Sequence, residues 1–408
     1  MKVYLVGGAV RDMLMGRNPK DLDFVVVGST PEEMVAEGFK SVGKDFPVYI
    51  HPDQKGEFAL ARTERKTGDG YTGFETDHSP EVTLEEDLRR RDLTINAIAF
   101  DWETNEIVDP FGGQEDIDNG ILRPVSDAFS EDPVRVLRAA RFLARHPDFK
   151  PSVELINVCD EMSALGELDH LTPERVWKET EGALGEAKTS RYFRFLAGYG
   201  IFPEVEAWLD VQEHNKWHPE YDVFEHIMLA LDVYNLGSLY KFGVLCHDLG
   251  KPRAYAESDG AKSTRHEDYG VPIVDALCDR LRIPNDYRRF GKLCAKYHTH
   301  CHISFNMKPK TIHKLLKLFK SQGEFEMFLN VAKADKMGRG KPACDWYYPQ
   351  PDYMMLCWGR MKNIDRKSIT SSMPPGPKLG EAIAQAEIAA IASVDKTRME
   401  AEYVKSHL

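Results

Sequence analysis

The stretch Val3-Tyr4-Leu5-Val6-Gly7-Gly8-Ala9-Val10-Arg11-Asp12, with Asp21-Leu22-Asp23 shortly after it, decides the fold of the N-terminal part of this chain. The apolar run of residues 3–6 predicts a β-strand, and the glycine pair ends it. Apolar periodicity predicts a helix over residues 9–15, and the chain is expected to return as a second strand over residues 21–27. This strand–turn–helix–strand unit predicts a domain that combines a sheet with helices.

The same unit carries candidate chemistry. Side chains at i and i+2 of a strand point to one face, so Asp21 and Asp23 are expected to converge and could hold Mg²⁺. The Gly7-Gly8 turn allows backbone N–H groups to approach a phosphate at the start of a helix. Each feature alone is more often an ordinary turn or a solvated strand edge. Their combination within 23 residues, with Arg11 one helical turn beyond the glycines, favours a metal-dependent site for a nucleoside triphosphate.

Composition predicts an ordinary globular protein. The 408 residues are 42% apolar and 29% charged, which allows two to four domains with substantial cores. No apolar stretch is long enough for a membrane span, and the first residues lead directly into a strand without a signal peptide. The seven cysteines are scattered and form no CxxC pair, which favours reduced thiols. We therefore expect a cytoplasmic protein.

The net charge of −12 hides one basic region. Residues 287–320 contain no Asp or Glu and nine Lys or Arg. Four of these lysines recur at spacings of 4, 3 and 3, as expected for one face of a helix: Lys310, Lys314, Lys317 and Lys320. Such a face is often only solvated surface. Without acids to balance it, we expect it to contact the phosphate backbone of RNA.

Strand-like runs, which include residues 58–61 and 96–100, are confined to the first 125 residues, and helical periodicity dominates after residue 130. The predicted fold class is therefore α+β, with a small β-sheet head followed by helical domains. The clearest helices are expected over residues 134–149, 173–184, 191–199, 222–235, 269–282 and 310–320. Four domains are expected, over residues 1–128, 129–212, 213–340 and 341–408.

The helix expected after residue 133 carries a stripe of arginines at spacings of 3, 3 and 4, namely Arg135, Arg138, Arg141 and Arg145. Like charges at this spacing repel, so helix stability alone does not favour the stripe. Cytosine and adenine each present an amine donor beside a ring-nitrogen acceptor. The Asp132 carboxylate and the Arg135 guanidinium, one turn apart, could pair with both bases and leave U and G mispaired. The alternative is structural, with Asp132 as an N-cap and Pro133 as the first helical residue.

The motifs described so far, together with two others, resemble those of the class II tRNA nucleotidyltransferases, the CCA-adding enzymes. The bacterial form with a C-terminal HD phosphohydrolase domain is the nearest match, from residue 1 to about residue 360. In order, the motifs are the Gly7-Gly8 turn, Asp21-Leu22-Asp23, Arg90-Arg91-Asp92-Leu93-Thr94-Ile95-Asn96, Asp109-Pro110-Phe111-Gly112-Gly113 and Glu131-Asp132-Pro133-Val134-Arg135-Val136-Leu137-Arg138.

The resemblance implies roles for individual residues. Asp21 and Asp23 would hold the catalytic Mg²⁺, and Asp132 with Arg135 would act as an amino-acid template for CTP and then ATP. Residues 65–74 would form a flexible loop that allows the change from C to A addition, and Gly68, Gly70 and Gly73 suit such a loop. The other nucleotide contacts would be Gly8, Arg11, Arg91, Arg138 and Arg141.

A second group of residues, His226, the adjacent pair His247-Asp248, and Asp335, resembles the H…HD…D pattern of HD-domain phosphohydrolases. A lone helical histidine is more often packed or exposed, but a neighbouring imidazole and carboxylate can bind one metal ion. His266 and His298 are expected to be further ligands or phosphate contacts. Mixed nitrogen and oxygen ligands suit Mg²⁺, Mn²⁺ or Ni²⁺ equally. No role is assigned to His300, Cys301 and His302.

The resemblance implies tRNA, CTP and ATP as partners, no membrane, and a monomer or homodimer. The tRNA 3′-hydroxyl would attack the α-phosphate of CTP or ATP, and pyrophosphate would leave. The second site would hydrolyse 2′-phosphate or 2′,3′-cyclic phosphate esters. Three alternatives remain open: a bacterial poly(A) polymerase, an enzyme that adds only A or only CC, and a signalling module with an inactive head. The retention of Asp21 and Asp23 argues against the last of these.

Overall fold

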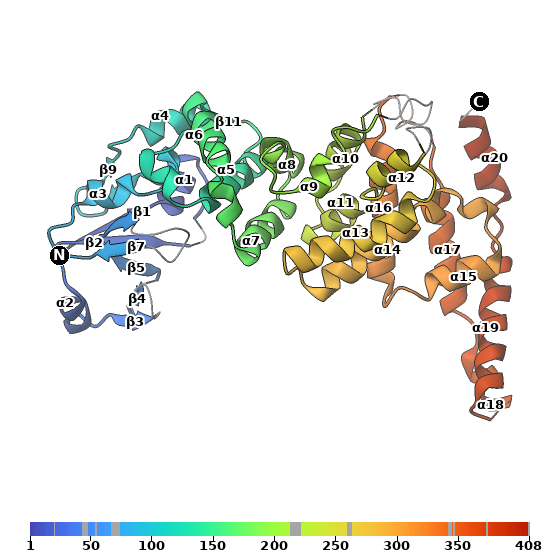
Figure 1. Ribbon diagram of the computed structural model, residues 1–408. Coiled ribbons are helices and arrows are strands. Elements are labelled where there is room, and N and C mark those ends of the chain that lie inside the picture. Colours follow the sequence, from blue (N-terminus) through green and yellow to red (C-terminus); the bar gives the residue numbers. More distant parts are fainter. Residues whose placement is uncertain are drawn as a thin grey trace. The chain divides into compact units, whose positions relative to one another are not determined.

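The computed structural model describes all residues except 20, 43–47, 54, 67–73, 213–221, 259–262, 342–344, 346, 373 and 407–408. The chain forms two compact units, Met1–Val176 and Trp177–Leu408. In Figure 1 the first unit runs from blue to green and the second from green to red. The finer division into four domains stays a prediction.

The first unit is built on a seven-stranded sheet with the order β3-β4-β5-β2-β1-β8-β9. The central strand β2 pairs in antiparallel fashion with β1 and in parallel fashion with β5. The strands are β1 (Lys2–Val6), β2 (Asp23–Val27), β3 (Lys40–Val42), β4 (Val48–Ile50), β5 (Glu57–Leu60), β8 (Ala99–Asp101) and β9 (Glu106–Val108). Two small sheets accompany it, the hairpin β6 (Thr63–Lys66) with β7 (Phe74–Asp77) and the pair β10 (Ile121–Leu122) with β11 (Lys150–Pro151).

Alternating side chains give the large sheet two buried faces. On one face, Leu5 packs with Ala9 and Val10 of α1. On the other, Tyr4 and Val6 join a second apolar cluster. The helices of this unit are α1 (Gly8–Leu14), α2 (Pro31–Ala36), α3 (Leu84–Arg89), α4 (Gly113–Asn119), α5 (Val134–Arg145) and α6 (Val153–Ala164), and α7 (Pro173–Leu184) crosses the boundary between the units.

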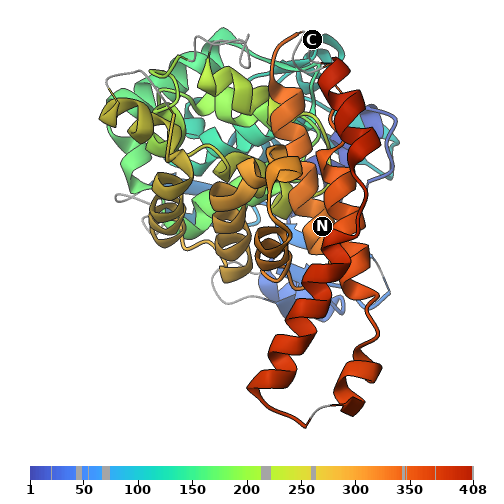
Figure 2. The same cartoon turned by 90° about the vertical axis from the view of Figure 1, so that its right-hand side faces the viewer.

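The regular secondary structure described for the second unit is helical, apart from one isolated β-bridge between Gln212 and Asp222. Its helices are α8 (Ser190–Leu196), α9 (Pro203–Glu206), α10 (Val223–Leu231), α11 (Ser238–Cys246), α12 (Lys251–Glu257), α13 (His266–Arg280), α14 (Asn285–His302), α15 (Pro309–Leu316), α16 (Gln322–Gly338), α17 (Gln350–Lys362), α18 (Arg366–Ser372), α19 (Pro377–Ala392) and α20 (Thr397–Ser406). The helices α17 and α19 pack side by side, as Figure 2 shows in orange and red. Among the described residues, no helix is long and apolar enough to cross a membrane.

The predicted α+β class is confirmed, and the predicted bounds of α7 are correct. The helices predicted over residues 191–199, 222–235, 269–282 and 310–320 are α8, α10, α13 and α15, and their bounds differ from the prediction. Because α15 ends at Leu316, Lys317 and Lys320 do not lie on the helix face predicted for the four lysines.

Three further boundaries in the first unit were wrong. Strand β2 begins at Asp23, and Asp21 lies in a bend before it. Helix α5 ends at Arg145 and does not reach residue 149, because Pro147 disfavours helical backbone at His146, whose φ is −120° and ψ 86°. The strand expected over residues 96–100 is β8, shifted toward the C-terminus behind a short 3₁₀ helix, Thr94–Asn96.

Candidate nucleotide and metal sites

Strand pairing brings two carboxylates, Asp23 and Glu57, to one end of the sheet, and Asp21 lies two residues before Asp23. In the β1–β2 pair Asp23 lies opposite Val6, the last residue before the glycine turn. In the parallel β2–β5 pair Asp23 lies opposite Glu57. Burial raises the pKa of Asp23; Arg91 opposes this rise, and the charges of Glu57 and Asp21 add to it. The crowding of negative charge beside the glycine turn suits a divalent cation.

Glu57 was not anticipated as part of this site. Its only signal in the sequence is a carboxylate at the start of a β-rich run, which is common at strand edges. The register that places it beside Asp23 depends on a pairing between strands more than 30 residues apart in the chain. Although surrounding protein atoms partly desolvate the Asp23 carboxylate, the residue keeps solvent-accessible surface, as do Asp21 and Glu57. All three carboxylates are therefore accessible to an ion and a nucleotide.

The turn at Gly7 requires glycine. Its φ is +68°, and a Cβ there would lie 2.8 Å from Nη1 of Arg91. The N–H of Gly7 donates to the carbonyl of Ile98 at 3.1 Å, which fixes the turn against the sheet. At Gly8 a Cβ would approach the Arg11 guanidinium to 3.5 Å. The absence of both side chains therefore leaves room for two arginines beside the carboxylates.

Arg11 is buried, and three neighbours hold it. Its Nη1 donates to Oδ1 of Asn96 at 2.6 Å, and its Nη2 pairs with Asp12 at 2.7 Å. Its guanidinium also lies 5.0 Å from the centre of the Phe142 ring. Burial lowers the pKa of Arg11, and Asp12 opposes that shift. The cation is thus held in one orientation beside the glycine turn.

Two buried carboxylates orient further arginines, and sequence reasoning missed their role. Asp87 accepts from Arg90 at 2.7 Å and from Arg91 at 3.2 Å. Asp92 accepts from Arg138 at 2.8 Å. Burial raises the pKa of Asp92, but the charge of Arg138 and hydrogen bonds from Asn96 and Arg138 outweigh it and lower that pKa to about 2. Asp92 therefore stays ionised and fixes Arg138.

The residues predicted to recognise the base, Asp132 and Arg135, lie before and on helix α5. The arginines of α5 lie on its more exposed side, and Val136, Leu137, Ala140 and Leu143 on the other side are buried. The guanidinium of Arg135 donates to the backbone carbonyls of Arg90 at 2.7 Å and Ala128 at 2.8 Å. Arg141 is half-buried on the same side of α5. The loop of residues 65–74 lies mostly outside the described residues.

Asp132 has a partner that the sequence did not indicate. Nη1 and Nη2 of Arg175, on α7, donate to its two oxygens at 2.9 and 2.7 Å. Oδ1 also accepts from the N–H of Val134, so the capping role considered for Asp132 is present. An ionised carboxylate can accept about four hydrogen bonds. Asp132 can thus be held by Arg175 and still accept from a base amine.

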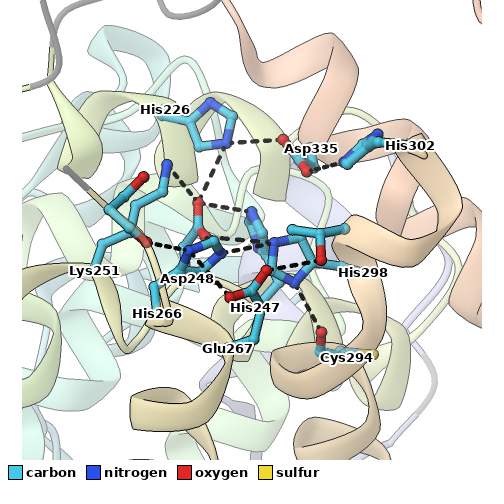
Figure 3. A network of polar contacts seen from close by, with 12 residues as sticks. His226, His247, Asp248, Lys251, His266, Glu267, Cys294, His298, His302 and Asp335 are labelled. Carbon is cyan, nitrogen blue, oxygen red and sulfur yellow. Dashed lines mark hydrogen bonds and ion pairs between the residues drawn. The ribbon is translucent and has the colours of Figure 1, made fainter. Parts of the chain in front are cut away.

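The second unit contains a buried cluster of imidazoles and carboxylates, shown in Figure 3. We call it the His/Asp cluster; its members are His226, His247, Asp248, His266, His298 and Asp335. Separate helices or their ends supply them: α10 carries His226, α14 carries His298, α16 carries Asp335, and the pair His247-Asp248 follows α11. His266 is the first residue of α13.

Close helix packing brings His266 to the cluster. A Cβ at Gly250, two residues after Asp248, would lie only 2.0 Å from the carbonyl oxygen of His266. Glycine at this position therefore allows the backbones on both sides to touch. The result is a distance of 3.3 Å between Nε2 of His266 and Oδ1 of Asp248.

The H…HD…D residues meet as the sequence predicted. Nε2 of His226 lies 3.3 Å from Oδ1 of Asp335 and 3.9 Å from Oδ2 of Asp248. Nε2 of His247 lies 3.2 Å from the same Asp248 oxygen. Burial raises the pKa of Asp248, but Lys251 and His247 outweigh it and hold that pKa well below its usual range. The donor set, ionised carboxylates with buried imidazole nitrogens, fits a divalent transition-metal ion.

His302, to which the sequence patterns gave no role, contacts this cluster. Its Nε2 lies 2.6 Å from Oδ2 of Asp335, and its Nδ1 lies 2.7 Å from the Tyr348 hydroxyl. Arg339 also pairs with Asp335, at 3.2 Å. These contacts orient Asp335 toward His226. The spacing of four residues between His298 and His302 was the available signal, since it places both on one face of α14.

The sheet with its glycine turn and carboxylates at one end defines the head of a nucleotidyltransferase. Comparison with known proteins agrees, because the sequence profile of the poly A polymerase head domain matches residues 3–123. Solved structures share the fold over nearly the whole chain. The Thermotoga maritima CCA-adding enzyme complexed with tRNA has a TM-score of 0.64 at 18% identity, covering 99% of this chain and 91% of that one. The Bacillus stearothermophilus CCA-adding enzyme in complex with CTP has a TM-score of 0.59 at 24% identity, covering 99% and 93%.

Sequence similarity to a curated protein identifies the family within the nucleotidyltransferases. The Multifunctional CCA protein of Nitrosococcus oceani is 44% identical over 405 residues, which span 96% of this chain and 98% of that protein. The chain therefore belongs to the family of CCA-adding enzymes.

Proposed function

We propose that this chain adds the 3′-terminal C, C and A of tRNA from CTP and ATP, without a nucleic-acid template, and releases pyrophosphate. The observation that supports the proposal is the position of Asp23 beside the Gly7-Gly8 turn at one end of the sheet, with the charge of Asp21 close enough to affect it, in a member of this family. The relative named as a Multifunctional CCA protein supports this reading over a poly(A) polymerase, since the similarity extends far beyond the shared head.

In the proposed reaction the tRNA 3′-hydroxyl oxygen forms a bond to the α-phosphorus of CTP or ATP. The bond between the α-phosphorus and the bridging oxygen of the β-phosphate breaks, pyrophosphate leaves with the electron pair, and the proton of the attacking hydroxyl is released to water. Asp21 and Asp23 would hold Mg²⁺, with Glu57 as a third oxygen donor. When bound, the ion lowers the pKa of the attacking hydroxyl and offsets charge on the leaving group. Arg11 and Arg91 would position the nucleotide phosphates, with Gly8 leaving room for them.

The decisive test of this function uses tRNA that lacks its CCA end. Purified protein is incubated with this tRNA and each labelled nucleoside triphosphate in turn. We expect incorporation of C, and of A only after two C residues are in place, with no incorporation of U or G. Addition of A alone, of C alone, or of a long A tract would replace the proposal by a partial enzyme or a poly(A) polymerase.

Base selection is assigned to Asp132 and Arg135, with Arg138 and Arg141 as neighbouring nucleotide contacts. Arg175 is a positioning residue for Asp132, because its guanidinium donates a hydrogen bond to each carboxylate oxygen. Asp132→Ala is expected to reduce the preference for CTP and ATP over UTP and GTP by about ten- to a hundredfold, since the variant has no acceptor for the base amine. The measurement is the ratio of kcat/KM values for the four nucleotides.

The matched control for this prediction is Asp127→Ala, an exposed carboxylate in the short 3₁₀ helix just before Asp132. It should leave the ratio unchanged. Removal of the hydrogen bond from the Val134 N–H also predicts a stability decrease of about 1 kcal/mol in the Asp132 variant. If only stability falls and selectivity is unchanged, Asp132 is merely a helix cap.

A second activity is proposed for the second unit. The His/Asp cluster would make it an HD-type phosphohydrolase that cleaves 2′-phosphate or 2′,3′-cyclic phosphate esters at RNA ends. The buried ligand set supports this: Nε2 of His247 and Oδ1 of Asp248 make no hydrogen bond within the described part of the chain. The ion is proposed to be Mg²⁺, Mn²⁺ or Ni²⁺, since carboxylate oxygens suit Mg²⁺ and Mn²⁺ and imidazole nitrogens suit Ni²⁺.

The tRNA surface is proposed to include Lys310 and Lys314 on α15, with Lys317 and Lys320 beyond its end. All four are exposed. The structure corrects one part of the basic region, however. The four basic residues of α14 are balanced by acids from other segments, Arg288 by Asp279, Arg289 by Glu324, Lys292 by Asp275 and Lys296 by Asp268. The absence of nearby acids in the sequence did not exclude tertiary partners.

Replacing Lys310, Lys314, Lys317 and Lys320 together by Gln is expected to weaken tRNA binding and to flatten its salt dependence. The slope of log K against log salt should fall by about one unit for each phosphate that a lysine no longer neutralises. Lys317 also pairs with Glu387 at 3.5 Å, so it should contribute least. Affinity for CTP alone should stay the same. Filter binding across a salt series measures both.

A second variant, with four exposed lysines of the C-terminal helices replaced by Gln, serves as the control for the α15 variant. Its substituted residues are Lys362, Lys367, Lys378 and Lys405. If this set lowers the salt slope and the α15 set does not, the tRNA surface lies along the C-terminal helices and the proposal for α15 is wrong.

A further inference from the structure

Arg145 is the one arginine of the α5 stripe to which the proposed reaction gives no role. It is exposed in the last turn of α5, seven residues after Arg138, which corresponds to about 10 Å along the helix axis. A second exposed arginine, Arg17, lies just beyond the end of α1. Both helices belong to the first unit (Figure 1), and their ends bring the two arginines to one imidazole.

Arg17 is held by His146, the residue that follows α5. Its Nη1 lies 3.3 Å from Nδ1 of His146. A guanidinium group only donates, so Nδ1 accepts and the imidazole hydrogen is on Nε2. The ring packs against Phe142 and Phe149, with ring centres 6.0 and 5.3 Å away. These contacts fix the imidazole, and the imidazole orients Arg17.

The imidazole holds Arg17 without cancelling its charge. His146 is buried; this burial and the nearby charges of Arg11, Arg17 and Arg145 lower the pKa of His146 to about 4. At neutral pH the ring is therefore uncharged. Arg138, by contrast, pairs with a buried carboxylate at 2.7 Å, which offsets much of its charge. Arg17 keeps its positive charge for another partner.

Arg17 and Arg145 have no acidic partner among the residues that the structure describes. The carboxylate of Asp12, which also acts on His146, is paired with Arg11 at 2.7 Å. Two exposed guanidinium groups beside one uncharged ring repel each other and create a local positive potential. An anion that binds both groups removes this repulsion.

A phosphate of RNA is the anion that this position favours. Guanidinium groups bind phosphate oxygens through paired N–H donors. The phosphates of the incoming nucleotide are assigned to the Gly7-Gly8 turn at the start of α1, whereas Arg17 follows the other end of this helix, about 10 Å away. The arginine stripe of α5 also leads away from the nucleotide contacts toward Arg145. A polymer whose 3′ end reaches the nucleotide supplies phosphates at this distance.

We propose that Arg17 and Arg145 bind the phosphate backbone of tRNA close to its 3′ end, and that His146 is a positioning residue for Arg17. The inference rests on the proposed addition of CCA. It names a tRNA-binding surface in the first unit, in addition to the lysines proposed on α15.

The test replaces Arg17 and Arg145 by Gln, singly and together, in the full-length protein. Filter binding of tRNA lacking CCA is measured across a salt series. We expect each substitution to lower the affinity about tenfold and the salt slope by about one unit, because each removes a charged contact with phosphate. The KM for CTP at saturating tRNA should stay the same. Lys40→Gln, at an exposed cation on β3 of the same unit, is the matched control and should keep affinity and slope.

Chemical change of the RNA locates the contact. A single uncharged methylphosphonate is placed at successive positions of the 3′ strand. At the contacted phosphate it should lower the affinity of the parent protein about tenfold and cause no further loss in the double variant, as expected for two groups that act on each other.

Two variants of nearly equal shape test the role of His146. Asn offers Arg17 an uncharged acceptor, so His146→Asn should keep the salt slope. His146→Asp offers an acceptor that cancels the charge of Arg17, so it should lower the slope as much as Arg17→Gln does. If thermal unfolding shows that His146→Asp does not fold, His146→Leu, which has no acceptor, replaces it and should lose affinity as Arg17→Gln does.

Unchanged affinity and slope in the double variant would overturn the proposal and leave the arginines as cations at helix ends. A raised KM for CTP with unchanged tRNA binding would also overturn it and assign them to the triphosphate. If the parent protein binds tRNA but adds no C or A, and the double variant still loses binding, this surface stands and the proposed addition of CCA is wrong.

Discussion

Asp21→Ala or Asp23→Ala is expected to abolish nucleotide addition and leave the fold intact. Without either carboxylate the Mg²⁺ site loses an oxygen ligand, and the charge of the leaving pyrophosphate is no longer offset. We expect a rate decrease of at least about a thousandfold, which corresponds to ~4 kcal/mol of transition-state stabilisation. Because both side chains are exposed at the end of the sheet, their removal leaves no cavity in the core. Single-turnover addition of labelled C to tRNA lacking CCA measures the effect.

Glu106→Gln is the control for this experiment, since Glu106 is an exposed carboxylate at the start of β9 in the same sheet. It should add nucleotides at the parent rate. Glu57→Gln should be impaired, because Glu57 lies beside Asp23 on the neighbouring strand. Near-parental addition by a folded Asp21 or Asp23 variant, with circular dichroism unchanged, would refute the catalytic assignment.

The other large effect is expected at the His/Asp cluster. His247→Ala or Asp248→Ala should remove metal-dependent hydrolysis of 2′-phosphate and 2′,3′-cyclic phosphate esters, to below about one-hundredth of the parent rate. CCA addition should be largely unchanged, since the head residues lie in the other compact unit. Both activities are measured on the same preparations, with His300→Gln as the control that keeps them.

The Asp248 substitution also affects stability, so loss of folding must be distinguished from loss of catalysis. Asp248→Ala removes the carboxylate that lies 2.9 Å from the buried ammonium of Lys251, and breaking a buried ion pair costs about 3–5 kcal/mol. Asp248→Asn keeps the shape and a hydrogen-bond acceptor, so it is the better-folded variant. Equal loss of hydrolysis and CCA addition in a folded His247→Ala protein would contradict two independent sites.

Much of the architecture was predictable because it depends on local patterns. The glycine pair between a strand and a helix, the carboxylates near the start of β2, and the apolar side of α5 were all expected, and the structure contains them. The pattern H…HD…D predicted that distant residues meet, and His226, His247 and Asp335 do surround Asp248. The end of α5 was also readable in principle from Pro147.

The amino-acid sequence by itself determined which side chains can bind phosphate, metal and base, because residue type and spacing set donors, charge and the face of each element. Only the tertiary structure decided their partners. Glu57 lies beside Asp23 because their strands pair, and Arg175 donates a hydrogen bond to Asp132 from another helix. The acids that neutralise α14 also come from other segments. Carboxylates and guanidinium groups act over a few ångströms through space, so their roles depend on packing between elements, which local sequence patterns do not encode.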